Sequence, residues 1–165
     1  MNQEKLALLT KLIHELADSS PDLIPIDTWF ALHRLVPLPA VEVLITRNNG
    51  REFLLTYRSD KFWEGWHIPG GFIKLKDQSL VAACNRIARD EIGISGVHNL
   101  RLVTVIMWAT HAYGGSPVSI LYSCLPNEEV RETKEMRFFS SIPHNMISHH
   151  TEFIECYIQK TTRNF

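Results

Sequence analysis

The chain has 165 residues, which is enough for one domain with a substantial core and too few for two ordinary domains. Hydrophobic residues make up 45% and charged residues 21%, as in soluble globular proteins. The formal net charge is -1, with 17 Lys and Arg against 18 Asp and Glu. This balance argues against an obligate nucleic-acid binder, but a local basic pocket for a small anionic ligand remains compatible with it.

The N-terminal segment 1–16 carries charges and lacks a small-residue cleavage site, so we expect no signal peptide. No apolar run reaches the length of a membrane span, and we expect no membrane association. The cysteines Cys84, Cys124 and Cys156 are odd in number and far apart. They are typical of reduced thiols, and we predict a cytoplasmic protein.

The first predicted element is an amphipathic helix over residues 3–18, which ends at Ser19–Pro21. Its apolar side chains recur at helical spacing: Leu6, Leu9, Ile13 and Leu16. We interpret it as a packing or dimerising helix without chemistry. Asp27 is predicted to cap a second short helix that runs through Arg34.

A β-hairpin is predicted next, with strands over 41–46 and 52–57 and a turn at Asn48–Gly50. Residues 66–74 read as short strand segments, broken at Pro69–Gly71.

A helix over 79–92 is predicted to end at Gly93. Two apolar stretches, 101–112 and 117–125, are joined by a Gly114–Pro117 turn and indicate another hairpin.

Residues 136–139 are predicted to form a last strand and residues 147–161 a closing helix. The order of elements favours one α+β domain with a mixed sheet covered by helices. We divide it into an N-terminal helical extension, 1–35, and a core, 36–165.

The segment that carries chemistry runs from Gly70 to Ile94: a Pro-Gly-Gly turn leads into a helix ending in Asp90 and Glu91. Glycines let the backbone approach a ligand and expose a carbonyl oxygen as a metal ligand. Mg²⁺ takes one or two carboxylates together with waters and phosphate oxygens. The pattern therefore predicts a metal platform beside an open turn.

This segment resembles the Nudix box, G-x5-E-x7-R-E-U-x-E-E-x-G-U, where U is aliphatic. Arg86 takes the arginine position, Asp90–Glu91 the acidic pair, and Gly93–Ile94 the end of the motif. Upstream, residues 66–71 resemble the W-x-x-P-G-G sequence of that family.

The resemblance implies an α/β/α sandwich and hydrolysis of a nucleoside diphosphate derivative with Mg²⁺, or Mn²⁺ in its place. It implies Gly71, Asp90 and Glu91 as metal ligands, with Glu91 as a catalytic residue; an i, i+4 pair with Arg86 is the alternative for Asp90. The implied partner is a small-molecule nucleotide, without nucleic acid or membrane; a homodimer is common in the family.

The chain departs from the box at three points. The loop from Gly71 to Gln78 is one residue longer, Gln78 stands for the first glutamate, and Ile87 replaces the glutamate after the arginine. These departures favour a single Mg²⁺ over several ions. They also support an alternative, a degenerate nucleotide-binding module with little catalysis; a coincidental glycine turn in an unrelated domain is the third alternative.

Similarity to the GDP-mannose mannosyl hydrolase branch, which also lacks the acid after the arginine, favours a nucleotide sugar as substrate. Residues 53–58 resemble the second strand of that branch, Glu42 matches its first-strand acid, and residues 77–80 resemble its D-E-T-L. Phe72 stands where the branch has an arginine, and its late Gln-His pair is not evident near Thr133–Lys134.

Four further residues are candidates for the site. Arg58 follows a strand, and its guanidinium suits phosphate oxygens, although a surface role is equally compatible. Glu42 lies among valines and needs a partner, so we expect it to meet Arg58 or to line the pocket. His67 and Phe72 flank the turn and are predicted to contact substrate, with a hydrogen-bonded structural histidine as the alternative for His67. Glu135 is predicted as the general base, with a solvated loop acid as the alternative.

Other residues have mainly structural interpretations. Arg86 is expected to brace the loop at Asp77 or Gln78. His149 and His150 fit the start of a surface helix. Four aromatic residues are candidates for a base-stacking platform, with packing as the default: Trp63, Trp66, Trp108 and Tyr113.

Overall fold

The computed structural model describes residues 2–18, 25–108 and 115–162. Its helices and strands follow the predicted order, with boundaries shifted by a few residues. In chain order they are α1 (Gln3–Asp18), α2 (Ile26–His33), β1 (Pro39–Arg47), β2 (Glu52–Ser59), β3 (Glu64–His67), β4 (Gly70–Phe72), α3 (Leu80–Ile87), the π-helical turn η2 (Ala88–Ile92), β5 (Val97–Met107), β6 (Val118–Pro126), β7 (Met136–Phe139) and α4 (Ser148–Thr162).

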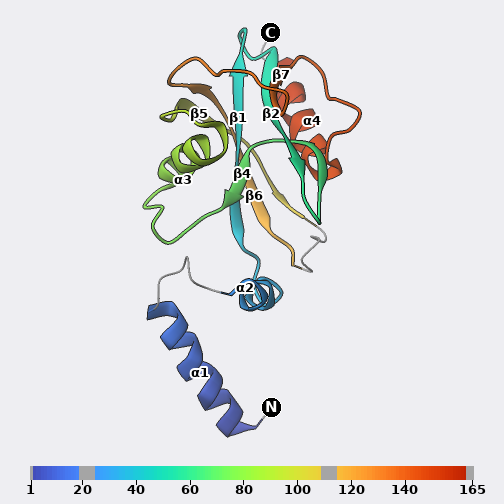
Figure 1. Ribbon diagram of the computed structural model, residues 1–165. Coiled ribbons are helices and arrows are strands. Elements are labelled where there is room, and N and C mark those ends of the chain that lie inside the picture. Colours follow the sequence, from blue (N-terminus) through green and yellow to red (C-terminus); the bar gives the residue numbers. More distant parts are fainter. Residues whose placement is uncertain (1, 19–24, 109–114, 163–165) are drawn as a thin grey trace.

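A seven-stranded mixed sheet forms the centre of the described molecule (Figure 1). Its main path runs β3-β2-β1-β6-β5, while β4 pairs with β1 and β7 pairs with β2. The β1–β6 pair is parallel and the other strand pairs are antiparallel. The predicted mixed sheet is confirmed.

Helices α3 and α4 lie on opposite sides of this sheet (Figure 1). The alternation of β1 explains both layers, since successive side chains point to opposite faces. Val41, Val43 and Ile45 pack in the cluster that contains α3, and Leu44 packs with Phe153 of α4 in the other cluster. Burying each such side chain contributes roughly 1.5–3 kcal/mol. The α/β/α sandwich is therefore confirmed, with its additional N-terminal helix.

The two N-terminal helices differ in how they meet this body. Helix α1 has no buried residue and extends away from the sheet (Figure 1). Helix α2 ends in His33, which is 1% exposed and packs on Gly115: a Cβ there would lie 2.6 Å from the His33 carbonyl oxygen.

The predicted cap of α2 was wrong. Pro25 holds the N-cap position, and its carbonyl accepts a hydrogen bond from the Trp29 amide (3.0 Å). Asp27 therefore lies inside the first turn rather than before it. Proline cannot donate a backbone hydrogen bond, so it is well suited to the start of a helix.

The second hairpin is confirmed, although β5 begins at Val97 rather than at residue 101. Residues 109–112 of its first predicted strand and Gly114 of its predicted turn lie outside the described residues, as do Ser19–Pro21. Among the described helices, none is long and apolar enough to span a bilayer.

Candidate active site

The Gly-Gly turn is positioned by pairing of β4 with β1, in which Gly70 lies opposite Glu42 and Gly71 opposite Val41. A Cβ on Gly70 would lie 1.9 Å from Glu42 Oε2. A glycine is therefore required for the turn to pass over the carboxyl group of Glu42.

The helix that follows the turn begins and ends as predicted. Ser79 caps it, since its Oγ accepts a hydrogen bond from the Ala82 amide (3.1 Å). The last turn widens into η2 and ends at Gly93, whose φ of 78° is left-handed. Glu91 in η2 reaches back to the turn, and its Oε2 accepts a hydrogen bond from the Gly70 amide (3.3 Å).

Arg86 braces the long loop at Asp77, one of its two predicted partners. Its Nε and Nη2 donate to Asp77 Oδ1 (2.8 Å) and Oδ2 (2.7 Å), and Nη2 also donates to the Phe72 carbonyl (3.0 Å). The Asp77 side chain is 4% exposed. This buried, bidentate pair fixes the loop between β4 and α3.

A pocket of about 770 Å³ opens beside the turn. Its size is in the range of small-molecule sites. Its polar lining residues come from several elements of the core: Glu42, Arg58, Asp60, Lys61, His67, Glu91, Ser119 and His150. Its other lining residues are apolar or glycine: Ile26, Trp29, Phe30, Ala40, Phe62, Ile68, Gly70, Gly71, Phe72 and Pro117.

Glu42 and Glu91 are the two glutamates that line this pocket. Glu42 is 5% exposed, and its Oε1 accepts a hydrogen bond from Ser119 Oγ (2.9 Å). Burial raises the pKa of Glu42 to about 8; the Ser119 hydrogen bond opposes the rise, and the charge of Glu91 adds to it.

Glu91 is open to solvent at the pocket, yet protein atoms crowd its carboxylate. The resulting loss of hydration raises its pKa to about 7, against the Gly70 hydrogen bond and the charge of Arg58. A cation bound here would relieve both the desolvation and the repulsion from Asp90.

The loop after β2 directs two lining residues toward the pocket. Asp60 Oδ1 accepts hydrogen bonds from the Phe62 amide (2.8 Å) and the Trp63 amide (3.0 Å), while Oδ2 accepts one from Arg58 Nε. Such an Asx turn stabilises a tight loop. Asp60 thereby holds both the guanidinium of Arg58 and the backbone of Phe62.

The two histidines on the wall have hydrogen-bond partners. His67 Nδ1 lies 2.9 Å from the Ile68 carbonyl and Nε2 lies 3.1 Å from Thr56 Oγ1. Burial lowers the pKa of His67 to about 4, so it is neutral at pH 7. His150, 6% exposed, accepts a hydrogen bond at Nδ1 from the Ile68 amide (3.3 Å); its predicted surface position was wrong, since α4 turns it onto the sheet.

Most of the site residues expected from sequence gather in the pocket wall: Glu42, Arg58, His67, Gly71, Phe72 and Glu91. Two do not line it. Asp90 lies with Oδ2 4.0 Å from Arg86 Nη1 and its side chain 57% exposed. Glu135 is exposed just before β7, where its carbonyl accepts a hydrogen bond from the Tyr57 amide (2.7 Å).

Sequence reasoning missed the aromatic lining formed by Trp29, Phe30 and Phe62. The sequence instead offered Trp66 and Trp108 as candidates, and both are core residues, 5% and 9% exposed. Trp63 packs edge-on against His149 (5.1 Å between ring centroids), and Tyr113 lies outside the described residues. No local signal could show that α2 folds over the pocket.

The residues present suit one divalent cation. The Glu91 carboxylate and the Gly71 backbone lie in the same wall, and phosphate oxygens of a substrate would complete an Mg²⁺ shell. Within the described ranges, no group of three or more His, Cys, Asp or Glu residues could hold a metal ion. Ile87 is 2% exposed and lies close to Gly71, since a Cβ on that glycine would be 3.0 Å from Ile87 Cδ1. An apolar side chain therefore stands where a second ion would need a carboxylate ligand.

The sequence profile of the NUDIX domain matches residues 36–152. This match covers more than half of the chain, which therefore belongs to the NUDIX family, whose enzymes generally use a divalent metal. The resemblance drawn from the glycine turn and the helix is confirmed, and the protein is a Nudix hydrolase.

One curated relative is the low-salt glycan biosynthesis protein Agl8 of Haloferax volcanii. It is 35% identical over 89 residues, which are 53% of this chain and 55% of the relative. The match thus spans about half the length of that protein.

Solved structures with the same fold include a NUDIX hydrolase from Nitrosomonas europaea, with TM-score 0.60 and 16% identity over 76% of this chain and 91% of that one. The NUDIX domain of Shewanella oneidensis NrtR, crystallised with ADP ribose, has TM-score 0.58 and 18% identity over 90% and 97% of the two chains.

Proposed function

We propose that this protein hydrolyses a nucleoside diphosphate linked to a second group, with a nucleotide sugar such as GDP-mannose as the favoured substrate. The observation that carries the proposal is that Glu42, Arg58, Glu91 and the backbone of Gly71 line the same pocket. We call these four residues the polar wall. Similarity to Agl8, a glycan biosynthesis protein, supports a sugar-linked substrate.

Each wall residue has a part in the proposed reaction. Glu91 and the Gly71 carbonyl would hold Mg²⁺, or Mn²⁺ in its place. Asp90, which lies outside the pocket wall beside Arg86, would become a further ligand only by turning away from that arginine. The metal supplies Lewis-acid stabilisation of the charge that develops on the diphosphate. Arg58 pairs with phosphate oxygens. Glu42, protonated near neutral pH, donates a hydrogen bond to a substrate oxygen, and His67 and Phe72 contact the substrate.

Hydrolysis needs a group that accepts the proton of the attacking water while the leaving oxygen departs from carbon or phosphorus. Glu135 is the predicted base, and Glu42 is the acid nearer to Glu91, which would serve as base only in its ionised form. Glu135→Gln and Glu42→Gln, compared by kcat under saturating substrate as a function of pH, distinguish them. A large fall confined to Glu135→Gln supports the predicted base. A fall confined to Glu42→Gln, in a protein whose kcat rises with pH toward about 8, assigns the role to ionised Glu42.

The decisive experiment screens the purified protein with Mg²⁺ against nucleotide sugars, dinucleoside polyphosphates and nucleoside triphosphates. We expect turnover of a nucleotide sugar that falls about a hundredfold or more in Glu91→Gln. GDP as product shows that the linkage between the sugar and the diphosphate breaks, and GMP shows that the diphosphate itself breaks at phosphorus. Glu155→Gln, an exposed acid on α4, is the matched control. Absence of turnover by the unaltered protein across the panel contradicts the catalytic proposal.

A second candidate is a nucleotide-binding module without catalysis, favoured by Ile87 in the place of a box glutamate. Heat stability separates the two. An intact metal site raises the free energy of unfolding by about 2.7 kcal/mol when ligand is present at a hundredfold its Kd. Stabilisation by Mg²⁺ with nucleotide that disappears in Glu91→Gln supports the enzyme. Stabilisation by nucleotide alone supports the module.

We further propose that the protein is cytoplasmic and acts on a small-molecule nucleotide, with neither nucleic acid nor a membrane as a partner. A homodimer through α1 and the division into an extension, 1–35, and a core, 36–165, stay predictions.

A further inference from the structure

The pocket has a second wall that the family match does not cover. The match begins at residue 36, whereas α2, which supplies Ile26, Trp29 and Phe30 to the pocket, ends at His33. The core adds Phe62 from the loop after β2 and Phe72 from β4. We call Trp29, Phe30, Phe62 and Phe72 the aromatic wall.

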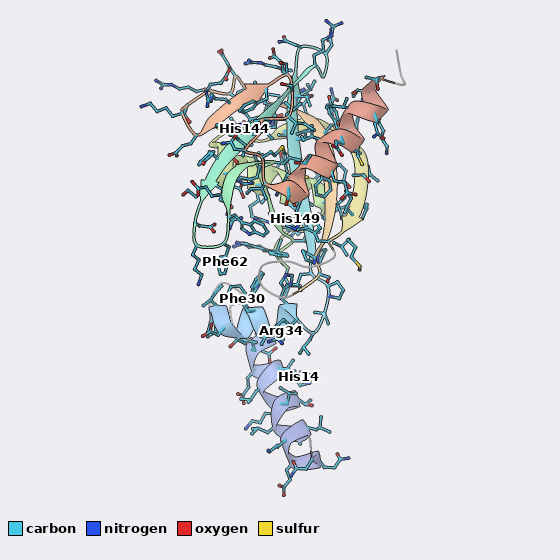
Figure 2. All side chains as sticks on the ribbon, turned by 90° about the vertical axis from the view of Figure 1, so that its right-hand side faces the viewer. His14, Phe30, Arg34, Phe62, His144 and His149 are labelled. Carbon is cyan, nitrogen blue, oxygen red and sulfur yellow. The ribbon has the colours of Figure 1, made fainter. Side chains whose placement is uncertain are left out.

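The rings of the aromatic wall contact one another across the junction between α2 and the sheet. Trp29 meets Phe72 edge-on at 4.9 Å between centroids, and Phe30 meets Phe62 edge-on at 6.1 Å. Figure 2 shows Phe30 and Phe62 near each other at this junction. Trp29 and Phe30 are only half-buried, so part of each ring remains accessible from the pocket.

Helix α2 is held in this position by its C-terminal end. Trp29 stacks on the buried His33 ring (5.0 Å), and His33 in turn packs on Gly115. Only residues 34–38 separate α2 from β1. The end of this linker is fixed, because the Leu38 carbonyl accepts a hydrogen bond from the Val118 amide (3.1 Å) and the Pro39 carbonyl accepts one from the Ile73 amide (2.9 Å). The short connection keeps Trp29 close to the start of β1.

The loop after β2 connects the polar and aromatic walls. Arg58 lies near the end of β2 and Lys61 on the loop itself, where Lys61 Nζ is 4.5 Å from the centroid of Phe62. A diphosphate that reaches from Glu91 to Arg58 and Lys61 would place its next group beside Phe62 and Phe30.

We propose that the aromatic wall binds the nucleobase of the substrate, and that Trp29 on α2 is its main stacking residue. This inference rests on the proposed function, which places the diphosphate at the polar wall. It adds that the nucleobase occupies the aromatic wall. Aromatic rings stack with any base. The lining around them is Ile26, Ala40 and Pro117, which offers few hydrogen-bonding groups for the hydroxyls of a sugar.

The test measures equilibrium binding by calorimetry, without turnover, for the full chain in Mg²⁺. The probes are ADP, GDP, UDP and CDP, inorganic pyrophosphate and GDP-mannose. The variants are Trp29→Leu, which keeps an apolar side chain without a ring, Trp29→Phe, which keeps an aromatic face, and Trp63→Ala, which alters a half-buried tryptophan that does not line the pocket.

We expect Trp29→Leu to weaken the preferred nucleoside diphosphate about tenfold, pyrophosphate not at all, and GDP-mannose by the same factor as GDP. Trp29→Phe restores most of the affinity, and Trp63→Ala binds like the unaltered protein. An unchanged melting temperature of Trp29→Leu without ligand shows that the loss does not come from unfolding.

Three results overturn the inference. The first is nucleoside diphosphates binding no tighter than pyrophosphate. The second is Trp29→Leu weakening pyrophosphate as much as nucleotide. The third is a loss confined to GDP-mannose, which would place the sugar on the aromatic wall. Failure of the proposed function is distinguishable, because nucleobase-dependent binding that responds to Trp29 without any hydrolysis upholds the inference and refutes only the catalysis.

Discussion

The two walls of the pocket are built in different ways. The polar wall comes from β1, β2, β4 and η2, and hydrogen bonds and strand register hold its members in place. The aromatic wall depends on ring contacts between α2 and the core. The proposed chemistry thus depends on backbone pairing, whereas the proposed recognition depends on the docking of one short helix. The two are therefore separable by mutation.

The largest expected effect concerns the brace behind the polar wall. Arg86→Ala leaves the buried Asp77 carboxylate without its bidentate partner, which costs about 3–5 kcal/mol of unfolding free energy. Urea unfolding measures it. Arg89→Ala, an exposed arginine in η2, is the control and should change stability by less than about 0.5 kcal/mol. A similar small change in Arg86→Ala would show that the loop does not need this brace.

A somewhat smaller effect is expected at the turn itself. In Gly70→Ala the added Cβ meets Glu42 Oε2 at 1.9 Å and the Val41 carbonyl at 2.9 Å, so strand β4 must shift. We expect about 3 kcal/mol of destabilisation and loss of nucleotide binding. In Gly93→Ala nothing lies within 4 Å of the new Cβ, but φ is +78°. That variant should lose about 1 kcal/mol and keep binding. Equal behaviour of the two would contradict the close packing of Gly70 on Glu42.

Stability should depend on pH through Glu42. Folding raises its pKa from 4.5 to about 8, so between these values the native state holds a proton that the unfolded chain releases. The unfolding free energy therefore falls as pH rises from 5 to 8. Glu42→Gln keeps a hydrogen-bond acceptor for Ser119 and reduces this slope, with a gain of about 2 kcal/mol at pH 8. A smaller slope of the same sign remains up to about pH 7, because folding also raises the pKa of Glu91. Thermal unfolding in metal-free buffer at pH 5, 6.5 and 8 checks it. An unchanged slope in Glu42→Gln would assign the dependence to other groups.

The smallest effect is expected on α1, which gives a contrast with α2. Ile13 is 45% exposed on a helix without buried residues, so Ile13→Ser should change stability by less than about 0.5 kcal/mol. Thermal unfolding at two protein concentrations is the measurement. A larger loss that shrinks as the protein is diluted would instead support the dimerising interpretation of this helix, because the unaltered dimer also dissociates on dilution.

Local patterns were sufficient for much of the fold. Apolar spacing predicted α1 at residues 3–18 and β7 at residues 136–139, and Gly93 marked the end of the box helix. The predicted cap of α2 was wrong because the helix begins earlier than expected, with Pro25 rather than Asp27 at the N-cap position. The start of β5 was missed because its first residues, from Val97 to Leu100, alternate apolar with polar only weakly and include Asn99 at φ 53°.

The sequence by itself determined the family, the glycine turn and the acids Glu91 and Glu42, because these depend on residue type and on short spacing along one chain segment. The tertiary structure decided which of them share a pocket: it turned Glu91 toward Gly70 and left Glu135 outside. It also placed Trp29 and Phe30 over the site and made His150 a buried wall residue. These last positions result from packing between elements distant in sequence, where contact depends on how helices dock on the sheet and no local spacing encodes it.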